Sequence, residues 1–218
     1  MFILDDDNQD KDTNQRGRGI SGVAVGIVTR NDDPKKLGRV KITFPWESDK
    51  NETNWTKIAT MSSGPDRGSM FIPEVKDQVL VAFERNDKNR PYVIGCVWDD
   101  EQKPPGPESN NTLKKIKTRS GHQVLFSDLK GEEKIEINSK SGHTIILDDN
   151  PKTNKITIHN NNKKSDFIEI NSNDESITIT SQKEILLKAR DINIKADNTI
   201  NIESGGFMTI KGARVSIN

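Results

Sequence analysis

The sequence has one cysteine, few aromatic residues and no long hydrophobic run. A single cysteine, Cys96, excludes a disulfide within the chain and suits a reducing compartment. Because Cys96 lies in the apolar run from Tyr92 to Trp98, we expect a buried structural thiol rather than a nucleophile. No apolar stretch reaches the roughly 18 residues of a membrane-spanning helix, so none is expected.

The chain also lacks an excess of charge of either sign. It has 33 Lys and Arg residues against 33 Asp and Glu residues, which argues against a general binder of nucleic acid or anionic membranes. Met1–Leu4 is followed at once by three aspartates, so we expect no secretory signal and predict assembly in the cytoplasm. Hydrophobic residues make up only 31% of the chain, which is low for a compact globule.

The apolar content that is present follows a β-repeat between Phe167 and Asn218. Pairs of apolar residues separated by one other residue recur about every eight residues, joined by Asn, Asp, Ser, Lys and Gly. Alternation at i and i+2 places both members of a pair on one face of a strand. The seven pairs are Ile168/Ile170, Ile177/Ile179, Ile185/Leu187, Ile192/Ile194, Ile200/Ile202, Met208/Ile210 and Val215/Ile217.

Seven strands with one apolar face each need a common core. A single-chain β-solenoid needs about three strands per coil, and repeat arrays usually need three or more repeats to be stable. Three identical chains wound around one axis would pair each strand with a neighbouring chain and gather the isoleucines on the axis. We therefore predict an intertwined trimeric β-helix (β-prism). A single-chain β-solenoid and the strands of a sandwich are the alternatives. The predicted trimer core is Ile168, Ile170, Ile177, Ile179, Ile185, Leu187, Ile192, Ile194, Ile200, Ile202, Met208 and Ile210.

The preceding residues divide into four predicted segments. Residues 1–19 are polar and are expected to form a flexible N-terminal arm. Residues 20–100 contain five strand-like runs separated by turn clusters, which predicts a five-stranded barrel of OB type. Residues 101–113 form a Pro-rich linker, and residues 114–166 form the neck of the predicted needle. The five runs are Val23–Thr29, Arg39–Phe44, Trp55–Met61, Gln78–Glu84 and Pro91–Val97; the cluster Ser62–Gly68 is expected to be a turn.

The neck contains a longer, 21-residue repeat. Arg119–Asp128 recurs as Lys140–Asp149, and Lys134–Asn138 recurs as Lys155–His159. Each repeat therefore contains two predicted strands. The shaft and tip, residues 167–218, follow with the repeat of about eight residues.

Three motifs in the barrel carry a specific resemblance. They are Gly38–Trp46 (GRVKITFPW), Phe71–Glu84 (FIPEVKDQVLVAFE) and Arg90–Gly95 (RPYVIG). Together they resemble the barrel domain of contractile-injection spikes: VgrG of type VI secretion, the gpV-like baseplate protein of contractile phages, and the spikes of phage-tail-like particles. In that family a trimeric barrel leads into a trimeric β-helical needle.

The resemblance implies a non-enzymatic, homotrimeric central spike that punctures a target cell envelope when the apparatus contracts. It also implies hub or baseplate proteins at the N-terminal end and a conical PAAR-type protein at the C-terminal end. VgrG proteins carry a large hub domain before the barrel, whereas only residues 1–19 precede it here. We therefore expect the hub to be a separate protein, or this chain to be a fragment of a longer one. The short junction before the needle leaves no room for the lysozyme domain of some phage spikes.

The last strand predicts the docking site of the tip protein. It has no polar cap, and open apolar layers with bare strand edges invite association. The predicted tip interface is Arg214, Val215, Ser216, Ile217 and Asn218.

No catalytic, cofactor or metal site is predicted. His122 and His143 occupy equivalent repeat positions after Ser-Gly, so a trimer would hold them in rings of three. A turn reused by the repeat explains them better, because no Asp, Glu or Cys is fixed at ligand spacing beside both. Carboxylate pairs such as Glu132/Glu133 have no supporting base or nucleophile. Two other function classes stay open: an OB-fold nucleic-acid binder with a β-rich oligomerisation tail, and a β-helical enzyme acting on polysaccharides.

Overall fold

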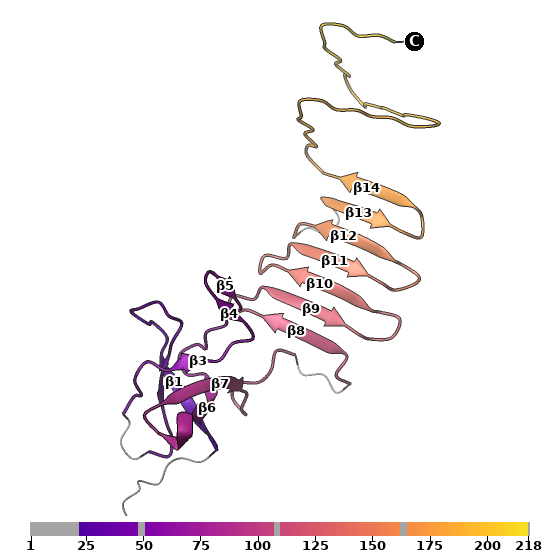
Figure 1. Ribbon diagram of the computed structural model, residues 1–218. Coiled ribbons are helices and arrows are strands. Elements are labelled where there is room, and N and C mark those ends of the chain that lie inside the picture. Colours follow the sequence, from indigo (N-terminus) through magenta and orange to yellow (C-terminus); the bar gives the residue numbers. More distant parts are fainter. Residues whose placement is uncertain (1–21, 48–50, 107–109, 162–164, 218) are drawn as a thin grey trace, which may run out of the picture. The chain divides into compact units, whose positions relative to one another are not determined.

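The computed structural model describes residues 22–47, 51–106, 110–161 and 165–217 (Figure 1). The chain forms two units, Met1–Asn111 and Thr112–Asn218. The described residues are all-β apart from one 3₁₀ turn, Glu84–Asn86, as the sequence predicts. No helix within these ranges is long and apolar enough to cross a membrane.

The first unit is a five-stranded barrel with OB topology. The sheet order is β2-β1-β6-β7-β3, and all neighbours are antiparallel except β3 and β7, which pair in parallel. Two backbone hydrogen bonds of 3.0 and 2.7 Å between Val40 and Thr56, the residues just before β2 and β3, close the ring. The five strands are β1 (Val23–Arg30), β2 (Lys41–Thr43), β3 (Lys57–Ile58), β6 (Gln78–Phe83) and β7 (Pro91–Val97).

The barrel is filled by alternate residues of its strands. In β6 every second side chain is buried, because successive side chains of a strand point to opposite faces. Gly26 of β1 faces the same interior, where a Cβ atom would overlap Ile42. The buried core is Val28, Val40, Ile42, Phe44, Val79, Val81, Phe83 and Val93.

Two expectations about the barrel are wrong. The predicted turn cluster Ser62–Gly68 contains a short antiparallel ribbon, β4 (Ser63–Gly64) and β5 (Arg67–Gly68). Cys96 is exposed rather than buried. The register of β6 and β7 shifts between Leu80 and Val81, and beyond that shift three consecutive residues of β7, Ile94 to Cys96, lie at the surface.

The second unit begins with a seven-stranded antiparallel meander in sequential order. Each repeat of the neck contributes two strands, β9 and β10 in the first and β11 and β12 in the second. Each strand has five residues and pairs in full register with its neighbours. The strands are β8 (Leu113–Lys117), β9 (Gln123–Ser127), β10 (Lys134–Asn138), β11 (Thr144–Asp148), β12 (Lys155–His159), β13 (Phe167–Asn171) and β14 (Ser176–Thr180).

The chain from Ser181 to Ile217 has no strand, which differs from the prediction of five further strands there. It runs beyond β14 as the yellow trace in Figure 1. Its apolar side chains are exposed, including Ile194 at 66% and Ile202 at 68%. A strand exists only when another strand accepts its backbone hydrogen bonds, and no described segment of the same chain is placed to do so.

Candidate functional site

Two rows of apolar side chains cross one face of the seven-stranded sheet β8–β14, which we call the needle sheet after the predicted needle. In an antiparallel ladder, residues directly opposite one another lie on the same face, so the register defines each row. The first row runs through Ile116, Val124, Ile137, Ile145, Ile158, Ile168 and Ile179. The second begins at Lys114 and continues through Phe126, Ile135, Leu147, Ile156, Ile170 and Ile177.

This apolar face is only half-covered within one chain. Ile145 is 37% exposed and Ile158 44% exposed, whereas Val79 and Val81 in the barrel core are completely buried. The side chains shield one another along the rows, but nothing in the described chain lies over them. A continuous exposed apolar surface of this kind marks an interaction site.

The opposite face of the sheet carries mostly polar side chains that pair with one another. The Lys155 ammonium lies 2.8 Å from the Glu169 carboxylate on the neighbouring strand. The Thr144 hydroxyl donates a 2.7 Å hydrogen bond to Asn138 Oδ1 across the β10–β11 pair. The two faces therefore differ in chemistry. Side chains of the polar face form hydrogen bonds and ion pairs within the chain, whereas none of the described residues covers the apolar face.

Tight turns of one design form one lateral edge of the sheet. In the first, the Gly121 amide donates to Thr118 O, the His122 amide donates to Thr118 Oγ1, and Gly121 has a φ of +98°. The second repeats this with Ser139, Gly142 (φ +93°) and His143. A left-handed residue after a type I turn is the usual three-residue hairpin loop, and it requires glycine.

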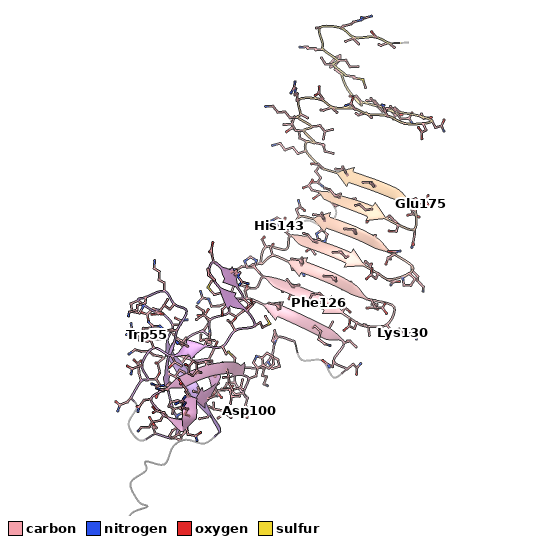
Figure 2. All side chains as sticks on the ribbon, viewed as in Figure 1. Trp55, Asp100, Phe126, Lys130, His143 and Glu175 are labelled. Carbon is pink, nitrogen blue, oxygen red and sulfur yellow. The ribbon has the colours of Figure 1, made fainter. Side chains whose placement is uncertain are left out.

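Longer loops form the other lateral edge. Figure 2 shows His143 at the edge with the tight turns, and Lys130 and Glu175 at the opposite edge. Successive long loops are joined by backbone hydrogen bonds, such as Asp149 N to Glu133 O at 3.0 Å. The ladder thus continues into the loops and stiffens this edge.

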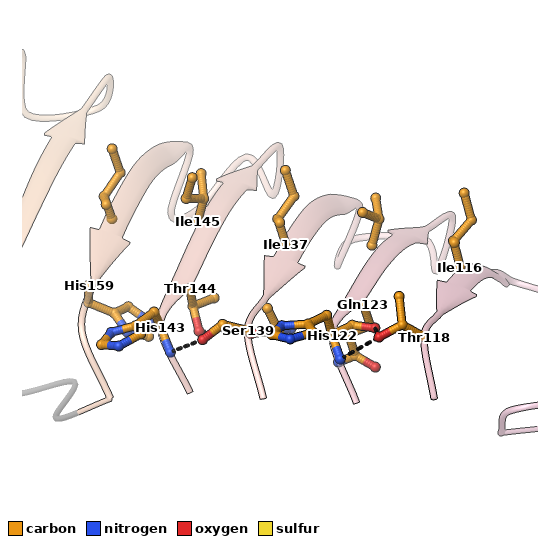
Figure 3. Close-up of a pocket in the computed structure, with 13 residues that line it drawn as sticks. Ile116, Thr118, His122, Gln123, Ile137, Ser139, His143, Thr144, Ile145 and His159 are labelled. Atoms are coloured by element: carbon orange, nitrogen blue, oxygen red, sulfur yellow. Dashed lines mark hydrogen bonds between the residues drawn. The ribbon is translucent and has the colours of Figure 1, made fainter. Parts of the chain in front are cut away.

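The histidines lie along the edge with the tight turns, beside a depression of about 480 Å³ (Figure 3). His122 Nδ1 accepts a 3.2 Å hydrogen bond from the Lys140 amide in the next turn, so His122 ties two turns together. His159 is buried and its Nδ1 lies 2.9 Å from Asn160 O. Isoleucines 116, 137, 145 and 158 line the same depression. Among the described residues, no group of three His, Cys, Asp or Glu side chains could hold a metal ion.

The structure brings together only part of the predicted trimer core. Ile168, Ile170, Ile177 and Ile179 lie on the apolar face of β13 and β14. The other eight predicted core residues, from Ile185 to Ile210, lie in the segment without strands and are exposed. Arg214–Ile217 of the predicted tip interface are exposed as well, and Asn218 lies outside the described residues.

The prediction of the apolar face missed its larger part, which lies in the neck. Nine residues of β8–β12 extend the two rows: Ile116, Val124, Phe126, Ile135, Ile137, Ile145, Leu147, Ile156 and Ile158. The signal was present in the sequence, because each repeat of the neck holds two apolar pairs with the same i, i+2 spacing. The loops between these pairs are longer than those after Phe167, so the pairs of the neck did not fit the period of about eight residues that identified the later ones.

The described chain thus combines an OB barrel with an antiparallel sheet that exposes one apolar face. Residues 24–98 match the family of type VI secretion system/phage-baseplate injector OB domains. The barrel of this chain is therefore an OB domain of that family, and the resemblance noted in the sequence is confirmed.

Spike proteins of type VI secretion are similar over about half of the chain. The chain is 30% identical over 131 residues to the type VI secretion system spike protein VgrG1a of Pseudomonas aeruginosa, covering 54% of this chain and 20% of that protein. It is 31% identical over 109 residues to the spike protein VgrG3 of Vibrio cholerae, covering 45% of this chain and 11% of that protein. The chain thus spans about a fifth or less of the length of these relatives, and it is related to the spike proteins of such systems.

Proposed function

We propose that this chain is the central spike of a contractile injection apparatus, in a phage tail, a type VI secretion system or a phage-tail-like particle. It acts as a non-enzymatic homotrimer that punctures the target envelope and is carried outward on contraction. The observation that carries the proposal is the apolar face of β8–β14, which is continuous across seven strands and uncovered by the described residues of one chain.

Three copies would cover this face by turning it toward a common axis. Completing the burial of one half-exposed isoleucine stabilises the assembly by about 1 kcal/mol, half of the value for a full side chain. Two rows in each of three chains supply many such contributions. The polar face would then point to solvent, which agrees with its internal pairing of Lys155 with Glu169.

The segment after β14 supports the same arrangement. From Ile185 onward it keeps the i, i+2 alternation of apolar residues, yet it has no strand partner among the described residues of its own chain. Neighbouring copies would supply the missing backbone partners, and the exposed isoleucines would become the core of the shaft. In this proposal the segment forms strands only in the assembly.

The test of the trimer compares two neighbouring residues on opposite faces of β14. Ile179 and Thr178 are both exposed in the single chain, so neither Ile179→Asp nor Thr178→Asp should disturb the chain's own fold. In a trimer, Ile179→Asp brings three carboxylates to the axis and should abolish assembly, whereas Thr178→Asp should be tolerated. Native mass spectrometry should give three times 24.5 kDa for the unchanged chain and for Thr178→Asp. A monomeric unchanged chain, or equal assembly of both variants, would refute the proposal.

The absence of enzymatic activity is part of this proposal. It is supported by the partners of three carboxylates of the sheet: Glu136 and Glu169 pair with lysines, and Glu133 accepts the Gly131 amide. Dye release from purified cell walls tests it. Hydrolysis that persists through repurification and disappears on replacing one carboxylate would overturn it.

A second candidate, nucleic-acid binding by the barrel, is favoured by one observation. The guanidinium of Arg30 and the ammonium of Lys41 lie 5.5 and 5.8 Å from the centre of the Trp55 ring, as in cationic sites that stack bases. Both cations are already paired, with Asp32 and Glu52 respectively, which weakens their attraction for phosphate. A gel shift with single-stranded oligonucleotides at low salt decides between the candidates.

Partners at both ends of the spike are proposed as well. A hub or baseplate protein would hold the barrel, and a PAAR-type tip protein would seat on Arg214–Asn218. The tip contact is tested by recovery of the tip protein with the unchanged trimer and with Ile217→Lys, which charges the end face but leaves the lower layers intact. Equal recovery would exclude this face as the docking site.

A further inference from the structure

The barrel has a groove of mixed apolar and polar lining beside the β4–β5 ribbon, distinct from the apolar face of the needle. The groove has a volume of about 850 Å³, and its lining includes Leu37, Met61, Met70 and Phe71. Met61 is 88% and Met70 82% exposed, which is far more than apolar side chains of this size usually show. Four such side chains around one groove indicate a surface to which another chain segment or another molecule binds.

The groove is built into the local fold. Gly68 has a φ of +140°, and a Cβ atom there would overlap the Ser62 carbonyl, so only glycine allows β4 and β5 to close. The Ser69 amide donates a 3.0 Å bond to the same carbonyl, and the Thr60 hydroxyl lies 2.6 Å from Ser69 O. These bonds fix Met61 and Met70 on the two chain segments that flank the ribbon.

Cations also line the groove. Lys36 and Arg67 belong to the lining, and neither has an ion-pair partner among the described residues. One carboxylate, Asp66, lies in the same lining. The exposed Lys35 adjoins Lys36, so the positive charges exceed the negative ones here. The fitting occupant is therefore a short apolar segment followed by carboxylates.

We propose that the groove binds the N-terminal segment of this chain, Phe2–Asp7. Its sequence is Phe-Ile-Leu-Asp-Asp-Asp: three large apolar residues to meet Leu37, Met61, Met70 and Phe71, then three carboxylates to meet Lys36 and Arg67. Elsewhere before Gly22 the only large apolar residues are Met1 and Ile20, so this match is specific to one stretch.

The segment is long enough to reach the groove. About fifteen residues separate Asp7 from the start of β1, and fully extended they span up to about 50 Å. A barrel of about 80 residues has a radius of gyration of only about 12 Å. A tether of this length gives an effective concentration of roughly 1 mM, so an intrinsic dissociation constant of about 100 µM would fill the groove about nine-tenths of the time.

The two exposed methionines are natural probes of this occupancy. Peroxide converts an accessible methionine to its sulfoxide, and the rate follows the fraction of time that the side chain is uncovered. Mass spectrometry of the full chain gives the oxidation rates of Met61 and Met70, with the denatured chain as the reference. In the unchanged protein we expect both methionines to react about tenfold more slowly than in the denatured chain.

Two full-length variants should remove this protection. Asp5→Asn/Asp6→Asn/Asp7→Asn deletes the charges, and Ile3→Ser/Leu4→Ser deletes the apolar contacts. Both should raise the oxidation rate of Met61 and Met70 severalfold, while the matched control Asp10→Asn/Asp12→Asn should react like the unchanged protein. Salt at about 0.5 M should also raise the rate in the unchanged protein, because it screens the carboxylate–cation attraction.

Three results would overturn the proposal. Rates in the unchanged protein equal to those of the denatured chain would mean that the groove stays open. Protection that persists in both segment variants but disappears on dilution would mean that a second copy covers the groove. Protection that persists in both variants at every concentration would mean that another part of the same chain does so.

Discussion

At the residue scale, Asp33 organises the loop between β1 and β2. Its carboxylate accepts backbone amides of Lys35 and Leu37 at 3.0 and 2.9 Å and the guanidinium fork of Arg39 at 2.8 and 2.7 Å. The side chain is only 3% exposed. Hydrogen bonds from Arg39 hold the pKa of Asp33 well below its ordinary value of 3.8.

Acid should therefore weaken the barrel through this residue. A carboxylate whose pKa is lower in the folded state stabilises the fold above its unfolded pKa, and this contribution is lost as the pH falls below 3.8 toward the folded pKa. Asp33→Asn should lower the urea midpoint at pH 7, and the gap to the unchanged protein should narrow below pH 3.8. The neighbouring Asp32→Asn is the control, because its exposed pair with Arg30 contributes little. A gap that is constant down to pH 2 would contradict this account.

Gly26 gives a second residue-scale prediction. A methyl group at this position would overlap Ile42 in the buried core of the barrel. Gly26→Ala should therefore destabilise the barrel by about 1–3 kcal/mol, the usual cost of overpacking. Gly95→Ala is the matched control, since a Cβ atom there meets nothing within 4 Å. Urea unfolding followed by tryptophan fluorescence measures both, and equal midpoints would contradict the prediction.

At the element scale, the tight turns set the register of the needle sheet. Gly142 has a φ of +93°, so Gly142→Ala strains the β10–β11 turn by about 1 kcal/mol or more. Amide hydrogen exchange in β10 and β11 should become about fivefold faster or more, because local opening costs less. Lys140→Ala in the same turn keeps the glycine and should leave exchange in these strands nearly unchanged. Equal exchange in both variants would show that the turn does not set the stability of the hairpin.

The strands themselves could be predicted from local pattern, but their partners could not. Alternating apolar residues between turn residues identified the five barrel strands and the paired strands of each repeat, because those patterns depend on neighbours in sequence. The β4–β5 ribbon escaped prediction because Ser63, Gly64 and Arg67 carry no apolar alternation. Cys96 was misplaced because its exposure depends on the register shift between β6 and β7. For the segment after Ser181, alternation predicts strands, but a local pattern does not say which segment would supply the hydrogen-bond partners.

At the scale of the whole molecule, the barrel and the needle should respond separately to disruption. Each unit has its own set of internal contacts, so their unfolding need not be coupled. In Ile179→Asp, we expect amides of the barrel strands to stay protected from exchange while residues 181–217 exchange freely. The unchanged protein should protect both. Free exchange of residues 181–217 in the unchanged protein would contradict the assembled needle.

Because the tight turns share one design, the length of the needle sheet can change in steps of one whole repeat. Removing residues 119–139 joins Thr118 to Lys140 and regenerates a turn of the same design, Thr-Lys-Ser-Gly-His, directly before β11. The strand after the join has the same five-residue length and the same register as the strand it replaces. A sheet of five strands would result, shorter by about 10 Å at the usual strand spacing. Inserting a second copy of the segment 119–139 would lengthen the sheet by an equal step. The length of the sheet can therefore change by whole repeats while the barrel stays the same.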